Sequence, residues 1–189
     1  FEGLPQVKQE LKQIEDLGVA TKTLLNEKFT TKEVQNQILN SDVSIIHLAT
    51  HAQFSSIADD TFILFWDQRM NVKQLGNLLR NNTLTSRRPI ELLVLSACET
   101  AIGDQRATLG LAGVAVRSGA RSTMATLWSV QDDSTAKFMG HFYSQLEQAK
   151  KTKINKAQAL QQAQLALLND QQYSNPHYWA PFVVVGNWQ

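Results

Sequence analysis

The sequence is poor in cysteine, in net charge and in long apolar runs. Its 189 residues include a single cysteine, Cys98. One cysteine cannot close a disulfide within the chain, and it cannot build a zinc ribbon or an iron–sulfur site. A secreted domain held together by disulfides is therefore excluded. Cys98 is either a small buried thiol or a nucleophile.

Charge and hydropathy exclude further classes. The chain has 18 Lys and Arg residues against 17 Asp and Glu, a formal net charge of +1. Nucleic-acid binders usually carry a larger basic excess, so no nucleic-acid partner is expected. No apolar run reaches the roughly 18 residues of a membrane-spanning helix, and no signal peptide is visible. The length and the 43% of hydrophobic residues predict one domain over residues 1–189. Because the chain starts at Phe1, we expect it to be a fragment of a longer protein.

Helical and strand patterns alternate along the chain. Helices are predicted at residues 5–17, 30–39, 72–80, 108–117, 132–146 and 154–168. Strands are predicted at residues 19–25, 43–50, 91–96, 121–128 and 182–185, with a hairpin over 61–72 that turns at Asp67 and Gln68. This alternation predicts an α/β fold with a mostly parallel sheet covered on both faces. In open sheets of this kind, ligands bind at the carboxyl ends of the strands.

Two reactive side chains follow buried strands of this predicted sheet. His51 comes directly after strand 43–50, and Cys98 comes just after strand 91–96. If the strands are parallel neighbours, an imidazole and a thiol emerge at the same edge, as a cysteine–histidine dyad requires. A nearby histidine raises the reactive fraction of a thiol that is otherwise only a few per cent ionised at neutral pH. The pair therefore favours a catalytic interpretation more than either residue does alone.

The other histidines are interpreted as structural. His47 lies in the middle of a predicted strand, His141 lies among aromatic residues of a helix, and His177 lies in a predicted loop. None of them has metal-ligand spacing with a carboxylate, so we expect no metal. Gly110 and Gly113 lack the lysine and the spacing of a phosphate-binding loop, and no cofactor is expected.

Five segments resemble the CHAT domain family, which is caspase-like and similar to separases. They are residues 46–51 (IHLATH), 94–100 (VLSACET), 119–122 (GARS), 127–130 (LWSV) and 177–182 (HYWAPF). The match runs in order over nearly the whole chain. The resemblance implies a caspase-like three-layer α/β/α sandwich with a small β-hairpin insertion, and His51 and Cys98 as the catalytic dyad.

The same resemblance implies the setting of the domain. It implies an oxyanion hole from backbone N–H groups at Ala52 and Cys98, and a protein substrate. It also implies a longer parent protein with tetratricopeptide repeats or other partner-binding modules upstream, a bacterial origin and a cytoplasmic location. Such domains have a strand before the first helix, for which residues 1–4 are too few. We expect that strand to lie upstream, or else the sheet to be rearranged.

The chain departs from the family pattern at two places that bear on the site. The family usually has glycine after the catalytic histidine, where this chain has Ala52. Related peptidases often have a pocket acid two residues before the nucleophile, where this chain has Ser96. The loop after Cys98 also has less glycine than usual. Ala52 favours the alternative that the domain is a catalytically silent interaction or signalling module.

The loops at the predicted catalytic edge are acidic. They contain Asp59, Asp60, Asp67, Glu99, Asp104, Asp132 and Asp133. A negative cleft attracts cationic groups, which predicts cleavage after arginine or lysine. The expected pocket acid is Asp132, close after Trp128, or else Asp67, although some of these acids are also ordinary helix caps. A third possibility is an acyltransferase or amidase that uses the same dyad on a small molecule.

Overall fold

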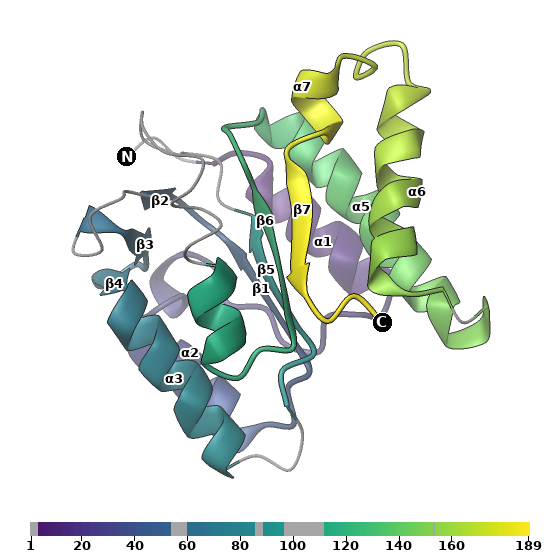
Figure 1. Ribbon diagram of the computed structural model, residues 1–189. Coiled ribbons are helices and arrows are strands. Elements are labelled where there is room, and N and C mark those ends of the chain that lie inside the picture. The colour runs from purple at the N-terminus through teal and green to yellow at the C-terminus, as the bar shows by residue number, and fades with distance from the viewer. Residues whose placement is uncertain (1–3, 54–59, 86–88, 97–111, 153) are drawn as a thin grey trace. The chain divides into compact units, whose positions relative to one another are not determined.

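The computed structural model describes residues 4–53, 60–85, 89–96, 112–152 and 154–189, so Cys98 lies outside the described residues (Figure 1). The chain divides into two compact units. We call Leu24–Ser129 with Val185–Asn187 the sheet unit. Phe1–Thr23, Val130–Val184 and Trp188–Gln189 form the helical unit.

The central sheet has four strands in the order β1-β5-β6-β7. They are β1 (Ile45–Ala49), β5 (Leu92–Ser96), β6 (Ser122–Thr126) and β7 (Phe182–Gly186), whose end belongs to the sheet unit. β5 pairs in parallel with β1 and with β6 (Figure 1). The predicted α/β fold with a mostly parallel central sheet is therefore confirmed.

Burial explains why these segments form the centre of the sheet unit. Every residue of β5 and β6 is buried, which is typical of parallel strands covered on both faces. Two helices contribute to the same core, α2 (Thr31–Asn40) and α3 (Val72–Thr85). Their apolar side chains, such as Ile38 and Leu79, belong to one buried cluster with Ile46 and Leu93 of the strands.

A separate antiparallel sheet has the order β2-β3-β4. Its strands are β2 (Ala52–Gln53), β3 (Phe62–Leu64) and β4 (Arg69–Asn71). Phe65 N–H donates to the Gln68 carbonyl at 2.9 Å, so β3 and β4 form the hairpin predicted over 61–72. The short β2 strand was not predicted from the sequence.

The segment between the first two helices differs from its prediction. α1 (Val7–Asp16) lies within the helix predicted at residues 5–17, and Gly18 follows its Leu17 cap with a φ of +70°, which suits glycine. The strand predicted at residues 19–25 is wrong, because Val19 and Ala20 donate their N–H groups back to the Ile14 carbonyl of α1. The start of the segment therefore continues from α1, and the 3₁₀ turn η1 (Asn26–Lys28) follows the segment.

The helical unit contains α1, α5 (Asp132–Thr152), α6 (Lys156–Leu168) and α7 (Pro176–Trp179). α5 begins at the predicted acidic start and runs past the predicted end. His177 lies in α7 and not in a loop, because Asn175 caps its N–H and Pro176 starts the turn. Within the described residues, no helix has both the length and the apolar character that a membrane span requires.

Candidate active site

Three neighbouring strands of the sheet unit end in register. Ala49, the last residue of β1, pairs with Ser96, the last residue of β5. The β5–β6 register pairs Val94 with Met124, and two residues further on it aligns Ser96 with Thr126, the last residue of β6. The prediction that the two strands are parallel neighbours ending at one edge is therefore confirmed, although β1, unlike β5, is only alternately buried.

The residues predicted for the site follow these strand ends at the same distance along the chain. His51 comes two residues after Ala49, and Trp128 comes two residues after Thr126. Both are half-buried. Cys98 comes two residues after Ser96 in the sequence and lies outside the described residues. Ser96 itself is buried, with 3% of its surface exposed.

The backbone around His51 is held by β3. Leu64 N–H donates to the His51 carbonyl at 2.9 Å, and the Thr50 hydroxyl donates to the Leu64 carbonyl at 2.7 Å. Both backbone polar groups of Leu64 therefore bind the segment that carries His51. The histidine is attached to β1 on one side and to the antiparallel sheet on the other.

Ala52 lies in β2 opposite Ile63. Leu64 and His51, the preceding pair, are hydrogen-bonded, and such pairs alternate along an antiparallel ladder. The Ala52–Ile63 pair is consequently not hydrogen-bonded, and Ala52 N–H points away from β3. β2 is the edge strand in the order β2-β3-β4. Ala52 adopts no left-handed φ, so alanine fits here without backbone strain.

Asp67 lies exposed at the turn of the β3–β4 hairpin, and its carboxylate binds α2. One oxygen accepts from Thr31 N–H at 2.9 Å and the other from the Thr31 hydroxyl at 2.8 Å. Burial alone would raise the pKa of Asp67, but the hydrogen bonds from Thr31, supported by the Asp67 and Gln68 backbone, lower it below 3.8. The carboxylate is therefore ionised and engaged with a helix N-terminus.

The remaining acids of the predicted edge lie in the sheet unit, in the helical unit or outside the described residues. Asp60 is exposed in the sheet unit, whereas Asp59, Glu99 and Asp104 lie outside the described residues. Asp132 and Asp133 start α5 of the helical unit.

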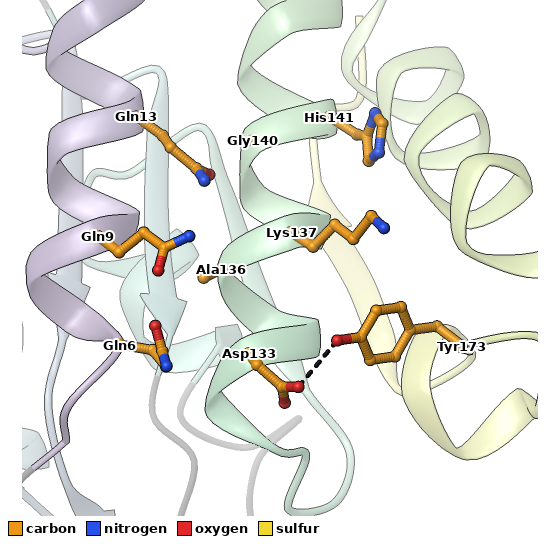
Figure 2. A pocket seen from close by; sticks show the side chains of 9 residues that line it. All are labelled: Gln6, Gln9, Gln13, Asp133, Ala136, Lys137, Gly140, His141 and Tyr173. Atoms are coloured by element: carbon orange, nitrogen blue, oxygen red, sulfur yellow. Dashed lines mark hydrogen bonds between the residues drawn. The ribbon is translucent and has the colours of Figure 1, made fainter. Parts of the chain in front are cut away.

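The helical unit contains a polar cleft that the sequence analysis missed. Its volume is about 540 Å³, and Figure 2 shows glutamines of the α1 wall facing the α5 wall. The lining residues are Gln6, Gln9, Gln13, Asp133, Ala136, Lys137, Gly140, His141 and Tyr173. The signal was present in the spacing, because Asp133, Lys137 and His141 recur every fourth residue and share one face of a helix. His141, predicted to be structural, is exposed in this wall.

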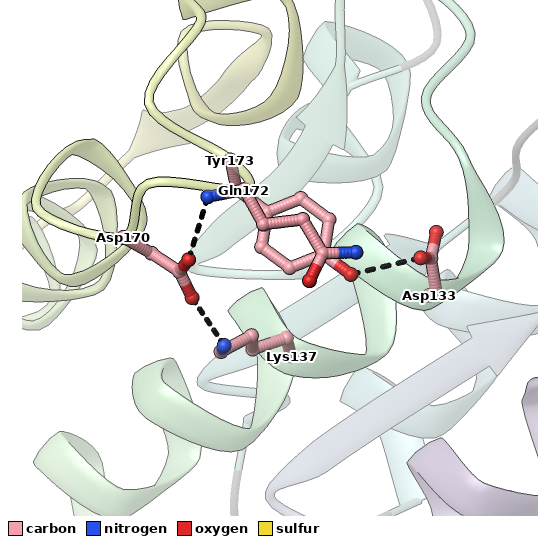
Figure 3. A network of polar contacts seen from close by, with 5 residues as sticks. All are labelled: Asp133, Lys137, Asp170, Gln172 and Tyr173. Atoms are coloured by element: carbon pink, nitrogen blue, oxygen red, sulfur yellow. Dashed lines mark hydrogen bonds and ion pairs between the residues drawn. The ribbon is translucent and has the colours of Figure 1, made fainter.

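Charged groups of the cleft are paired (Figure 3). Lys137 binds Asp170 and lowers its pKa, while the Tyr173 hydroxyl donates to Asp133 at 2.8 Å. Burial, with this hydrogen bond and the acids nearby, raises the pKa of Tyr173 to about 12. Desolvation and the Lys137 charge lower the pKa of His141. The cleft thus offers hydrogen-bonding groups, of which Lys137 is engaged by Asp170 and Asp133 by Tyr173.

Metal ligation has no support among these residues. In the portion of the chain that the structure describes, no group of three or more His, Cys, Asp or Glu side chains could hold a metal ion.

Comparison with known proteins identifies the family. A search of curated proteins returned no match. The family model described as the CHAT domain matches residues 1–187, nearly the whole chain. CHAT is a caspase-like peptidase family, so this match supports a peptidase in general terms. The five sequence segments, the parallel sheet and the family match therefore agree, and the chain belongs to the CHAT domain family.

Proposed function

We propose that the chain is a cysteine endopeptidase domain in which His51 and Cys98 form the catalytic dyad. The observation that carries this proposal is the register of β1 and β5, which ends both strands at one edge with Ala49 opposite Ser96. His51 and Cys98 each follow by two residues. Neighbouring strands are about 4.8 Å apart, so the two chain segments leave the sheet within reach of each other.

The proposed reaction is acyl transfer through a thioester. The Cys98 thiolate attacks the scissile carbonyl carbon, and His51 holds the proton and then gives it to the departing amine. Water then hydrolyses the thioester and regenerates the thiol. The backbone N–H groups of Ala52 and Cys98 are proposed to hold the oxyanion. Ala52 N–H points away from β3 and belongs to an edge strand, so it is not used by the antiparallel sheet, which supports its proposed role as an oxyanion donor.

We propose that cleavage follows arginine or lysine. Support comes from the excess of acids in the loops around the proposed site. Ser96 and Trp128 are proposed to line the substrate pocket, with Asp132 or Asp67 as the acid that pairs with the basic side chain. The substrate is proposed to be a protein, and the parent chain to carry tetratricopeptide or other partner-binding modules upstream in a cytoplasmic setting.

Thiol labelling tests the dyad. We expect iodoacetamide to alkylate Cys98 at least about tenfold faster near pH 7 than a free thiol, and His51→Ala to remove that excess. His47→Ala is the matched control, because it removes a histidine from the same strand region. If wild-type Cys98 reacts no faster than a free thiol, the peptidase proposal fails. Peptides that differ only before the cleaved bond test the specificity, and a preference for aspartate or a neutral residue would contradict it.

A silent interaction module is the second candidate. Ala52, where the family usually has glycine, is the observation that favours it. The ordinary strand conformation of Ala52 weighs against it, because alanine there keeps its N–H and adds no strain. Ala52→Gly decides between them. A large gain of thiol reactivity or peptidase activity in Ala52→Gly would indicate a site that alanine silences. If the wild type is already reactive and Ala52→Gly leaves its thiol reactivity and peptidase activity unchanged, the peptidase is favoured.

A further inference from the structure

The tip of the β3–β4 hairpin is fastened to the N-terminus of α2 by a charged side chain. Thr31 is the first residue of α2, and its N–H has no acceptor within the helix. Asp67 supplies that acceptor from 36 residues away, and it also accepts from the Thr31 hydroxyl. The negative charge of Asp67 is favourable beside a helix N-terminus. The same hydroxyl accepts from the Gln68 amide at 2.8 Å, so both turn residues bind Thr31.

The residues just before the turn are anchored to the same segment. Trp66 N–H donates to the Phe29 carbonyl at 3.0 Å. The Phe65 ring stacks on the Phe29 ring, with the centroids 4.6 Å apart and the planes at 15°. Phe65 is buried, whereas Trp66 is 61% exposed. The tip is therefore held at each residue from Phe65 to Gln68.

The other end of this anchored stretch holds the proposed catalytic histidine. Leu64 precedes Phe65 and binds the His51 carbonyl through its N–H and the Thr50 hydroxyl through its carbonyl. Asp67 is three residues from Leu64, a span of at most about 10 Å. A change that loosens the tip is therefore expected to weaken the Leu64 hydrogen bonds that hold the His51 backbone, because only a short stretch of chain separates the two.

We infer that Asp67 is a positioning residue for His51, acting through the Thr31 contact, the hairpin tip and the backbone of Leu64. This inference rests on the proposed function, in which His51 activates Cys98. It gives Asp67 a task different from that of a pocket acid, which contacts substrate and leaves the free enzyme unchanged. A misplacement of about 1 Å in a catalytic group can cost about a hundredfold in rate. The effect is therefore expected in the free enzyme, before any substrate binds.

The test compares Asp67→Ala and Thr31→Val, each alone and together, in the whole chain. Two properties are measured on protein shown to be folded by circular dichroism. They are the amide exchange rate of Leu64 followed by NMR, and the pH profile of Cys98 alkylation by iodoacetamide. Trp66→Ala is the matched control, because it removes a larger side chain from the same tip and leaves the Thr31 contact intact. Asp67→Asn is the conservative variant, because it keeps one acceptor oxygen.

We expect Asp67→Ala to speed Leu64 exchange about tenfold, which corresponds to the loss of a hydrogen bond to a charged group. It should also lower the His51-dependent alkylation rate severalfold and move the pH profile toward that of a free thiol. Thr31→Val should act in the same direction but more weakly, because the backbone N–H of residue 31 still donates to Asp67 and only the two hydroxyl bonds are lost. The double variant should add little to Asp67→Ala, because the bonds between Asp67 and residue 31 are already lost in that variant. Asp67→Asn should be intermediate, and Trp66→Ala should resemble the wild type.

The outcomes separate this inference from the proposed function. If wild-type Cys98 shows His51-dependent reactivity and Asp67→Ala retains both that reactivity and the Leu64 protection, only the positioning role is overturned. If Asp67→Ala leaves the alkylation rate of Cys98 in the substrate-free enzyme unchanged and instead weakens cleavage of basic substrates, Asp67 is a pocket acid and the inference is wrong. If wild-type Cys98 shows no His51-dependent reactivity, the proposed function fails and the positioning role fails with it.

Discussion

Replacement of Gly186 by alanine should destabilise the protein more than the same replacement at Gly18, Gly76, Gly113 or Gly140. Gly186 ends β7 with a φ of +101°, a conformation that alanine rarely adopts. A Cβ at this position would lie 2.5 Å from the Arg121 carbonyl oxygen, 3.0 Å from Val116 Cγ2 and 3.2 Å from Ser122 Cα. Two of these three are backbone atoms, which cannot move aside as the end of a side chain can.

The magnitude follows from two separate costs. A left-handed φ costs alanine about 1–2 kcal/mol relative to glycine. The forced shift of packed backbone adds about 1–3 kcal/mol. The Arg121 carbonyl also accepts from Asn187 N–H at 2.8 Å, and the new methyl would disturb that bond. We therefore expect Gly186→Ala to lower the free energy of unfolding by about 3 kcal/mol, measured by urea denaturation.

Two further glycines serve as controls that separate these costs. Gly18 has a φ of +70° but no atom within 4 Å of an added Cβ, so Gly18→Ala should cost only about 1–2 kcal/mol. Gly113 lies in the helical residues 112–117, and its nearest atom, on Arg117, is 3.8 Å away. Gly113→Ala should stabilise by up to about 1 kcal/mol. If Gly186→Ala costs no more than Gly18→Ala, the close contact with the Arg121 carbonyl is refuted.

Three other predictions concern single contacts. An added Cβ at Gly140 would lie 2.7 Å from Gln13 Oε1, the end of a flexible side chain, so Gly140→Ala should change the unfolding free energy by less than about 1 kcal/mol, and Gln13→Ala should remove any cost. Because folding lowers the pKa of Asp67 below 3.8, its contribution to stability is complete above that pH and lost below it; urea denaturation of wild type and Asp67→Asn should converge as the pH falls below 3.8. Folding raises the pKa of Tyr173 from 10.0 to about 12, so its contribution is lost between those values; a tyrosinate absorbance titration should place this group near pH 12, and Asp133→Asn should bring it closer to 10. A Tyr173 that titrates near 10 in the wild type would contradict its buried contact with Asp133.

The elements that local patterns define were predictable from the sequence. Apolar runs in the sequence located β1, β5 and β6. The helix predicted at residues 30–39 is α2, whose start is capped by Thr30 Oγ1, which accepts from Glu33 N–H at 3.2 Å. The strand predicted at residues 19–25 failed for the opposite reason. A strand exists only where a partner strand accepts its hydrogen bonds, and Val19 and Ala20 donate theirs to α1.

In the candidate site, too, some features follow from the local sequence and others from tertiary contacts. Local sequence alone determined that His51 and Cys98 each follow a strand, because both strands are nearly continuous apolar runs. Burial on both faces, expected for both runs, holds for β5, whereas β1 is an edge strand with alternate residues only half-buried. Only the tertiary structure decided that Ala49, Ser96 and Thr126 end in register, since that depends on hydrogen bonds between segments far apart in the chain. It also decided that Asp67, which in the sequence is one acid among many, binds Thr31. The local sequence around an aspartate does not identify its hydrogen-bond partner. The partner of Asp67 depends on where the fold places the β3–β4 turn.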